Sequence, residues 1–220
     1  MKRINLLILT IIFALLTLIS LIGIYFAHQQ PTEEKKAITL YTYSHDGKYD
    51  YIATLKPNNL YNKTTLRPEE GTLYIKITES INVTFTYTFN CSLPSNITLR
   101  YSIKEILKSP KWPEKTIATS PLTVFAHNQT NATTFTTNHF INVTAIDKLK
   151  DSIDKETGTY TSEYSVNIQP KIEITANTTV GTIDELFTPN MTMNFRYRTA
   201  EGDYIAIEGL THTQQGSIQK

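Results

Sequence analysis

Two hydrophobic patterns divide the chain. The stretch Ile4–Ala27 is an apolar run of 24 residues without Asp, Glu, Lys or Arg. As an α-helix it would be about 36 Å long, enough to cross a hydrocarbon core of about 30 Å. Beyond it, apolar residues often alternate with polar ones. The pattern therefore predicts a transmembrane helix followed by a β-rich domain.

A cleaved signal peptide is the alternative for this apolar run. The apolar part of a signal is about 7–15 residues long and ends in small residues. Here the run is longer, and cleavage after Ala27 would place Tyr25 where a small side chain is required. We therefore expect an uncleaved anchor. Lys2 and Arg3 predict that the N-terminus is cytoplasmic and that the remaining chain lies outside the cell membrane.

Alternation of period two marks the strands. The clearest strand is Ser80–Phe89, whose odd positions from Ile81 are apolar and whose even positions are polar. Weaker runs predict strands at Tyr49–Leu55, Ile97–Ile103, Phe135–Ala145, Tyr160–Ile168, Ile172–Ala176, Met191–Tyr197 and Tyr204–Glu208. Turn signals occur at Asp46-Gly47, Pro57-Asn58-Asn59, Pro68–Gly71, Ser109-Pro110, Pro170 and Glu201-Gly202. Many short strands and frequent turns favour a mainly β, antiparallel β-sandwich.

One stretch has helical spacing instead. Within Ala145–Gly158, Ile146, Leu149 and Ile153 recur at helical intervals, Thr144 is a candidate N-cap and Gly158 a candidate C-cap. We expect one short helix crossing between strands. The predicted organisation is a cytoplasmic tip and anchor at 1–27, a stalk at 28–36, a β-sandwich ectodomain at 37–210 and a polar tail at 211–220.

Composition narrows the function classes. The chain has 21 Lys and Arg against 20 Asp and Glu, so its charge gives no reason to expect nucleic-acid binding. Cys91 is the single cysteine, which rules out an internal disulfide. An intermolecular bridge through Cys91 and simple burial both stay open.

Sequons for N-glycosylation are the one motif in clear excess. The 15 Asn and 47 Ser and Thr predict about three Asn-x-Ser/Thr motifs by chance. Nine occur, at Asn62, Asn82, Asn90, Asn96, Asn128, Asn131, Asn142, Asn177 and Asn190. Strand parity places Asn82 and Asn142 opposite the apolar stripe. The alternative is accidental accumulation in a Thr-rich chain. We expect a glycosylated exterior domain with these asparagines exposed.

The sequence contains only weak signals for a catalytic or metal-binding site. Ser44, His45 and Asp46 are adjacent, so on an extended chain they point to alternate sides and cannot form a catalytic triad. The sequence has five histidines, and no two of them have the close spacing that is typical of a metal site. They are His28, His45, His127, His139 and His212. His139 is read as an inward residue with a partner.

An acidic cluster lies in the predicted helix. It consists of Asp147, Asp151, Asp154 and Glu156. A weak calcium site is one interpretation, but the Asp-x-Asp-x-Asp-Gly loop is absent. Interleaved lysines, with Asp151 and Lys155 four residues apart, favour a solvated face of ion pairs. We expect no metal, no cofactor and no enzymatic activity.

The chain resembles an archaeal family of membrane-anchored exterior proteins that is described only as a domain of unknown function. The resembling stretches are Leu73–Phe89 (LYIKITESINVTFTYTF), Ile141–Ile168 and, more weakly, Tyr43–Tyr51. The resemblance implies an anchored β-rich ectodomain without known catalysis. Such relatives often continue into a second C-terminal hydrophobic segment, whereas this chain ends at Lys220 in a polar stretch.

The expected function follows from these features. We expect a single-pass membrane protein, held in the lipid bilayer through Ile4–Ala27, with a non-catalytic binding or cell-envelope role toward an unidentified protein or envelope partner. An accessory subunit of a membrane complex, such as one that handles secreted proteins, is the alternative. A hydrolase would need a convergent pocket that the sequence does not reveal.

Overall fold

The computed structural model describes residues 2–29 and 38–220, which belong to two compact units divided after residue 38. The first contains helix α1, Lys2–Gln29. Its segment Ile8–Phe26 is long and apolar enough to span a membrane, a property that signal sequences share. Thr17 Oγ1 donates to the carbonyls of Ala14 (2.9 Å) and Phe13 (3.2 Å), so the helix satisfies this hydroxyl itself. From residue 30 on, the predicted stalk lies outside the described residues.

The second unit is mainly β, as predicted, and its strand pairs are antiparallel. Its strands are β1 Thr39–Leu55, β2 Thr65–Leu66, β3 Leu73–Tyr74, β4 Thr78–Ser109, β5 Trp112–Thr119, β6 Thr123–Asn142, β7 Glu163–Asn177, β8 Thr182–Phe187, β9 Met191–Thr199, β10 Gly202–Glu208 and β11 Thr211–Gln219. They join into one sheet of order β11-β1-β4-β7-β9-β10-β3, with β2, β5, β6 and β8 attached alongside. The curved sheet is nearly barrel-like, and the two separate sheets of the predicted sandwich are not confirmed.

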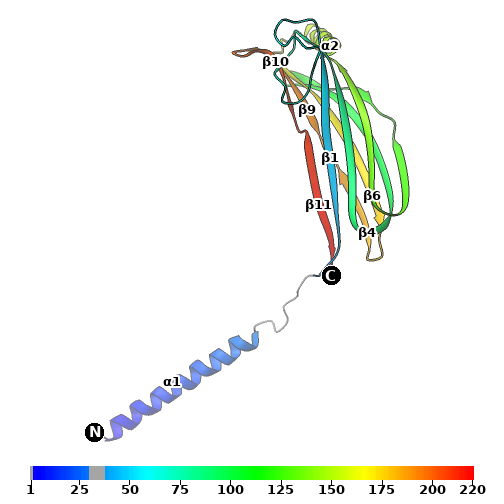
Figure 1. Ribbon diagram of the computed structural model, residues 1–220. Helices are drawn as coiled ribbons and strands as arrows, with labels where there is room; N and C mark the ends of the chain where they lie inside the picture. The colour runs from blue at the N-terminus through cyan, green and yellow to red at the C-terminus, as the bar shows by residue number, and fades with distance from the viewer. Residues whose placement is uncertain (1, 30–37) are drawn as a thin grey trace. The chain divides into compact units, whose positions relative to one another are not determined.

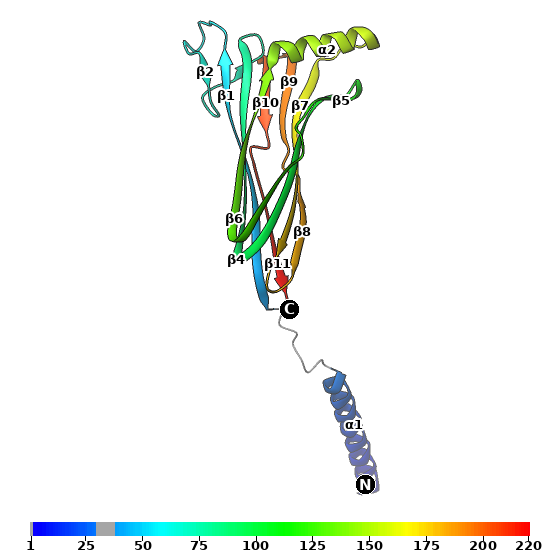
Figure 2. The same ribbon diagram turned by 90° about the vertical axis from the view of Figure 1, so that its right-hand side faces the viewer.

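Strand β4 organises this unit. Its first part pairs with β1, and its second part pairs with β7. Strand β6 accompanies both parts along the other side of β4, and the register shifts between Asn90 and Ile97. The β4–β6 ribbon bends there and continues from one layer of strands into the other (Figure 1). Helix α2, Val143–Thr157, lies across the opposite end of the strands (Figure 2).

Alternation along β4 builds the core, which confirms the predicted Ser80–Phe89 strand. The side chains of Ile81, Val83, Phe85, Tyr87 and Phe89 are buried. The intervening threonines are on the outer face and bond to side chains of β6. Between the layers, the rings of Tyr101 and Phe135 stack with centroids 4.0 Å apart. One core is therefore shared by both parts of the ribbon.

Two predicted turns are wrong because both lie inside strands. Gly47 is within β1, where an added Cβ would come within 3.0 Å of Pro189 Cβ, so glycine permits this close packing. Pro170 is within β7, opposite Ile103 of β4. On the other flank, β9 pairs only as far as Ile168 and β8 begins at Ile172. Proline is tolerated in β7 because no strand pairs with this edge at residue 170, so a backbone N–H is not required there.

Element boundaries also need correction at α2 and near the C-terminus. The N-cap of α2 is Asn142, whose side chain accepts from Ala145 N, and not the predicted Thr144; the predicted C-cap Gly158 is confirmed, in the left-handed conformation. The residues predicted as a polar tail form β11, which pairs with β1. Strands β5 and β8 were not predicted. Their sequences carry several charges and bury little of their surface.

Candidate functional site

The nine sequon asparagines are all exposed: Asn62, Asn82, Asn90, Asn96, Asn128, Asn131, Asn142, Asn177 and Asn190. The predicted parity is confirmed, because the neighbours Val83 and Ile141 are buried while Asn82 and Asn142 face outward. Asn142 caps α2 through Oδ1, the oxygen, whereas a glycan is attached to the nitrogen. Exposure makes modification sterically feasible, and glycosylation itself stays a prediction.

Five of these asparagines gather near the bend of the β4–β6 ribbon. Asn90 is opposite Ala132, next to Asn131, and Asn96 is opposite Asn177 of β7. The fifth, Asn128, follows His127, which is opposite Ile97. This clustering depends on strand register, so the linear spacing of the sequons does not reveal it.

An open groove of about 720 Å³ lies beside the bend. It is lined by neutral groups of β1, β4 and β11, including Thr42, Ser44, Asn90 and Gln215. Cys91 also lines the groove; it is half-buried, and its thiol donates to the carbonyl of Asn131 at 3.3 Å. The groove offers hydroxyl and amide groups to a ligand, but no charged side chain lines it.

His45 is fully buried in an aromatic environment. Its ring stacks on Phe187 at 5.3 Å and meets Phe89 edge-on at 5.1 Å. Nδ1 is 2.8 Å from the Tyr87 hydroxyl, while Nε2 has no hydrogen-bond partner. Burial lowers the pKa of His45, although the nearby carboxylates of Glu185 and Asp46 oppose this effect. Ser44 and Asp46 lie on the other side of the strand, so the three residues form no triad, as predicted.

Asp154 differs from the predicted solvated acidic face because it is buried. Its Oδ1 accepts from Thr161 Oγ1 (2.7 Å), Thr159 Oγ1 (3.0 Å) and Trp112 Nε1 (3.2 Å). Its Oδ2 accepts from Thr161 N at 2.9 Å and lies 3.4 Å from Lys150 Nζ. Burial alone would raise the pKa of Asp154, but these hydrogen bonds lower it to about 2. The carboxylate therefore ties the end of α2 to β5 and the following loop.

Lys150 is the buried cation of this cluster. Its Nζ is 3.0 Å from Asp151 Oδ1 and 5.4 Å from the centre of the Tyr197 ring. The predicted pair of Asp151 with Lys155 is wrong, since Asp151 pairs with Lys150 instead. Among the described residues, no group of three or more His, Cys, Asp or Glu side chains is arranged to hold a metal ion.

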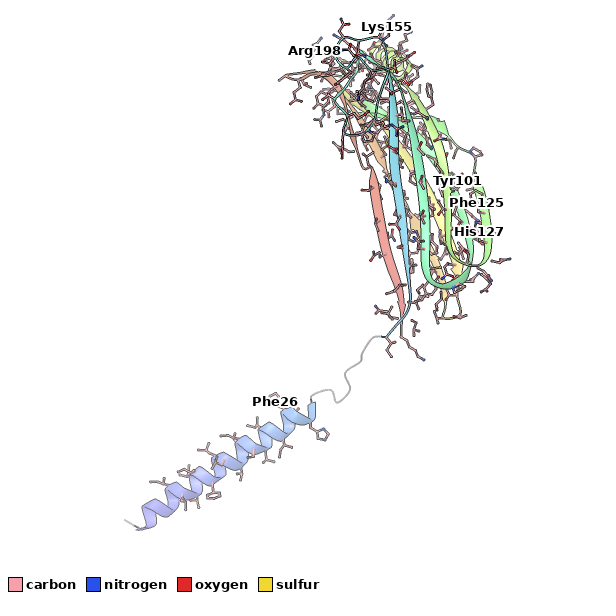
Figure 3. All side chains as sticks on the ribbon, in the orientation of Figure 1. Phe26, Tyr101, Phe125, His127, Lys155 and Arg198 are labelled. Atoms are coloured by element: carbon pink, nitrogen blue, oxygen red, sulfur yellow. The ribbon has the colours of Figure 1, made fainter. Side chains whose placement is uncertain are left out.

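His139 has the partner that the sequence analysis expected. Its Nδ1 is 2.9 Å from Glu105 Oε1, which connects β6 in one layer to the second part of β4 in the other. Nearby, Tyr101, Phe125 and His127 follow one another along the ribbon (Figure 3), with centroids 6.1 Å and 6.4 Å apart. These contacts consolidate the side of the unit that β6 borders.

The structure thus defines an apolar N-terminal helix and a β-rich unit whose surface carries the sequons. In comparisons with known proteins, no family model and no curated protein matches the chain. A crystal structure of a protein from Archaeoglobus fulgidus aligns with 55% of this chain and 88% of its own, at 9% identity and a TM-score of 0.29. A likeness at that level carries no argument, so membership of the archaeal membrane-anchored family stays a prediction.

Proposed function

We propose that the protein is a single-pass membrane protein whose β-rich unit lies outside the cell, carries N-linked glycans and has a non-catalytic binding or cell-envelope role. In this proposal α1 stays uncleaved as the anchor, with its N-terminus in the cytoplasm. The β-rich unit is then a β-sandwich in which two layers, joined by the β4–β6 ribbon, enclose one core.

The observation that carries the proposal is the placement of the sequons. A buried asparagine cannot carry a glycan, because a core has no partners for the hydroxyls of the sugar. All nine sequon asparagines are exposed on a unit that follows an apolar helix of membrane-spanning length. The neutral groove at the bend supports a binding role, since it presents hydroxyl and amide groups to a polar ligand.

Protease treatment of intact cells tests the orientation. Protease added from outside should digest epitopes beyond residue 38, and complete protection of the β-rich unit would contradict the exterior location. The anchor is tested on the same sample, because an uncleaved chain retains an N-terminal epitope placed before α1.

Mass spectrometry of the intact protein tests glycosylation. Asn82→Gln should remove the mass of one glycan. Asn138→Gln is the matched control, because Asn138 is also exposed on the outer face of the same layer but belongs to no sequon. A wild-type mass equal to that of the bare polypeptide would contradict the glycoprotein proposal. Affinity purification of the intact protein from its native membrane then distinguishes an independent envelope protein from a subunit of a larger complex.

A further inference from the structure

Asn90 is the one sequon asparagine among the nine that lines the open groove. Its side chain is exposed, and its amide has no hydrogen-bond partner among the described residues. By contrast, the side-chain oxygens of Asn96 and Asn177 accept from Gln129 N (3.1 Å) and Thr182 Oγ1 (3.0 Å). A glycan on the amide nitrogen of Asn90 would therefore begin at the wall of the groove, and its attachment breaks no existing bond.

Two rows of polar side chains cross the outer face of β4, β1 and β11 beside Asn90. In the first row, Ser44 is opposite Asn90 on one side and Gln215 on the other. In the second row, Thr42 is opposite Ser217. Neighbouring strands are about 4.8 Å apart, so the first row extends about 10 Å from β4 to β11. The rows form a path of hydroxyl and amide groups that begins at Asn90.

The chemistry of this path fits a neutral saccharide. Sugar hydroxyls both donate and accept hydrogen bonds, and so do the hydroxyl and amide groups that line the groove. No charged side chain lines it, so nothing there selects an anionic or cationic ligand. Its volume of about 720 Å³ lies within the range that is typical of small-ligand sites.

We propose that the groove holds the first sugars of an N-linked glycan on Asn90, which lie across β1 and form hydrogen bonds with side chains of β11. This inference rests on the proposed glycosylation and names the ligand of the groove. The covalent attachment favours this occupant over a free saccharide, because a ligand tethered at the wall of its site has a high effective concentration there. A saccharide from another molecule has to compete with it.

The glycan has a structural effect on the last strand of the sheet. Strand β11 is at one end of the strand order, and its backbone pairs with β1 alone. It shares no backbone pairing with β4, so a glycan that extends from Asn90 to Gln215 adds a connection that the sheet lacks. An edge strand with few buried side chains opens locally at a low free-energy cost. The added hydrogen bonds oppose this opening.

Hydrogen exchange of the backbone amides in Thr211–Gln219 tests the proposal on the full chain, purified in detergent from its native membrane. Asn90→Gln removes the sequon but keeps an amide at this position. Loss of about two hydrogen bonds to the glycan should make these amides exchange about tenfold faster than in the wild type. Asn82→Gln is the matched control, because Asn82 is also on the outer face of β4 but does not line the groove. It should leave exchange in β11 unchanged.

The same comparison in a host that attaches no N-linked glycans separates the effect of the sugar from that of the side chain. Without glycans, wild type and Asn90→Gln should exchange at equal rates in β11. The proposal is overturned if the glycosylated wild type and Asn90→Gln chains exchange equally, since the groove then does not hold this glycan. It is also overturned if the chains without glycans show the same tenfold difference.

Site-resolved mass spectrometry of the wild-type chain distinguishes this inference from the proposed function. The inference requires a glycan on Asn90. Glycans on other sequons but not on Asn90 would overturn the inference and leave the proposed function intact. If no sequon carries a glycan, both fail.

Discussion

Asp154→Asn should destabilise the β-rich unit by about 3 kcal/mol at pH 7. The folded carboxylate has a pKa of about 2, against an ordinary value of 3.8. A pKa difference of one corresponds to about 1.4 kcal/mol, so ionisation contributes about 2.5 kcal/mol. An asparagine amide would also direct its NH₂ group at a donor, either Thr161 N or the side chains of Thr159 and Trp112. Leaving such a donor unpaired adds to the loss.

The pH dependence gives this prediction a definite sign. Because the pKa of Asp154 is lowered in the folded state, its stabilisation is fully present above about pH 4 and is lost as the pH falls towards 2. The difference in unfolding free energy between wild type and Asp154→Asn should therefore narrow over that range. Trp112 is the single tryptophan and donates to Asp154, so its fluorescence during urea unfolding reports on this site directly.

Asp151→Asn is the matched control for Asp154→Asn. Asp151 also pairs with Lys150, but its side chain is 69% exposed, so its removal should cost less than about 1 kcal/mol. Equal losses from the two substitutions would refute the reasoning. So would a difference between wild type and Asp154→Asn that stays constant from pH 5 to pH 2.

Three further outcomes are expected. Phe85→Ala should lower the free energy of unfolding, measured with urea, by about 3–5 kcal/mol because it creates a cavity. Thr86→Ala, on the outer face, should lower it by less than about 1 kcal/mol. Equal losses would contradict the inward and outward assignment of these residues. Gly216→Ala should cost about 1–3 kcal/mol, measured in the same way, because the added Cβ would overlap the Tyr43 ring. Because burial lowers the pKa of His45, stability should fall as the pH drops below about 6.5. His45→Phe should remove that component of the pH profile.

Strands whose inward-facing residues are all apolar could be predicted from the sequence alone. Ser80–Phe89 was predicted because each residue that faces the core is apolar, and the outward orientation of Asn82 follows from the same alternation. Strand β11 was missed because Ile218 is its one large apolar residue, which leaves no alternating pattern, and the strand is held by backbone pairing with β1. Pro170 was misread because its place in β7 depends on where β8 and β9 stop, which no local pattern records.

The polar sites were less predictable than the fold. Asp154 was grouped with its exposed helical neighbours because its main partners, Trp112 and Thr161, lie outside the helix. Similarly, the closeness of Asn96 to Asn177 requires the pairing of β4 with β7. Local spacing predicts the face on which a residue lies, whereas long-range pairing decides which polar groups meet.

The pairing of β1 with β11 has a consequence for biosynthesis. The first strand of the β-rich unit gains this neighbour only when the last strand has been made. Long-range pairing of this kind slows folding, because the loop-closure entropy is lost before the contacts form. During synthesis, residues 39–48 of β1 therefore lack this neighbour until residue 219 has emerged, so this part of the sheet cannot form strand by strand as the chain is made.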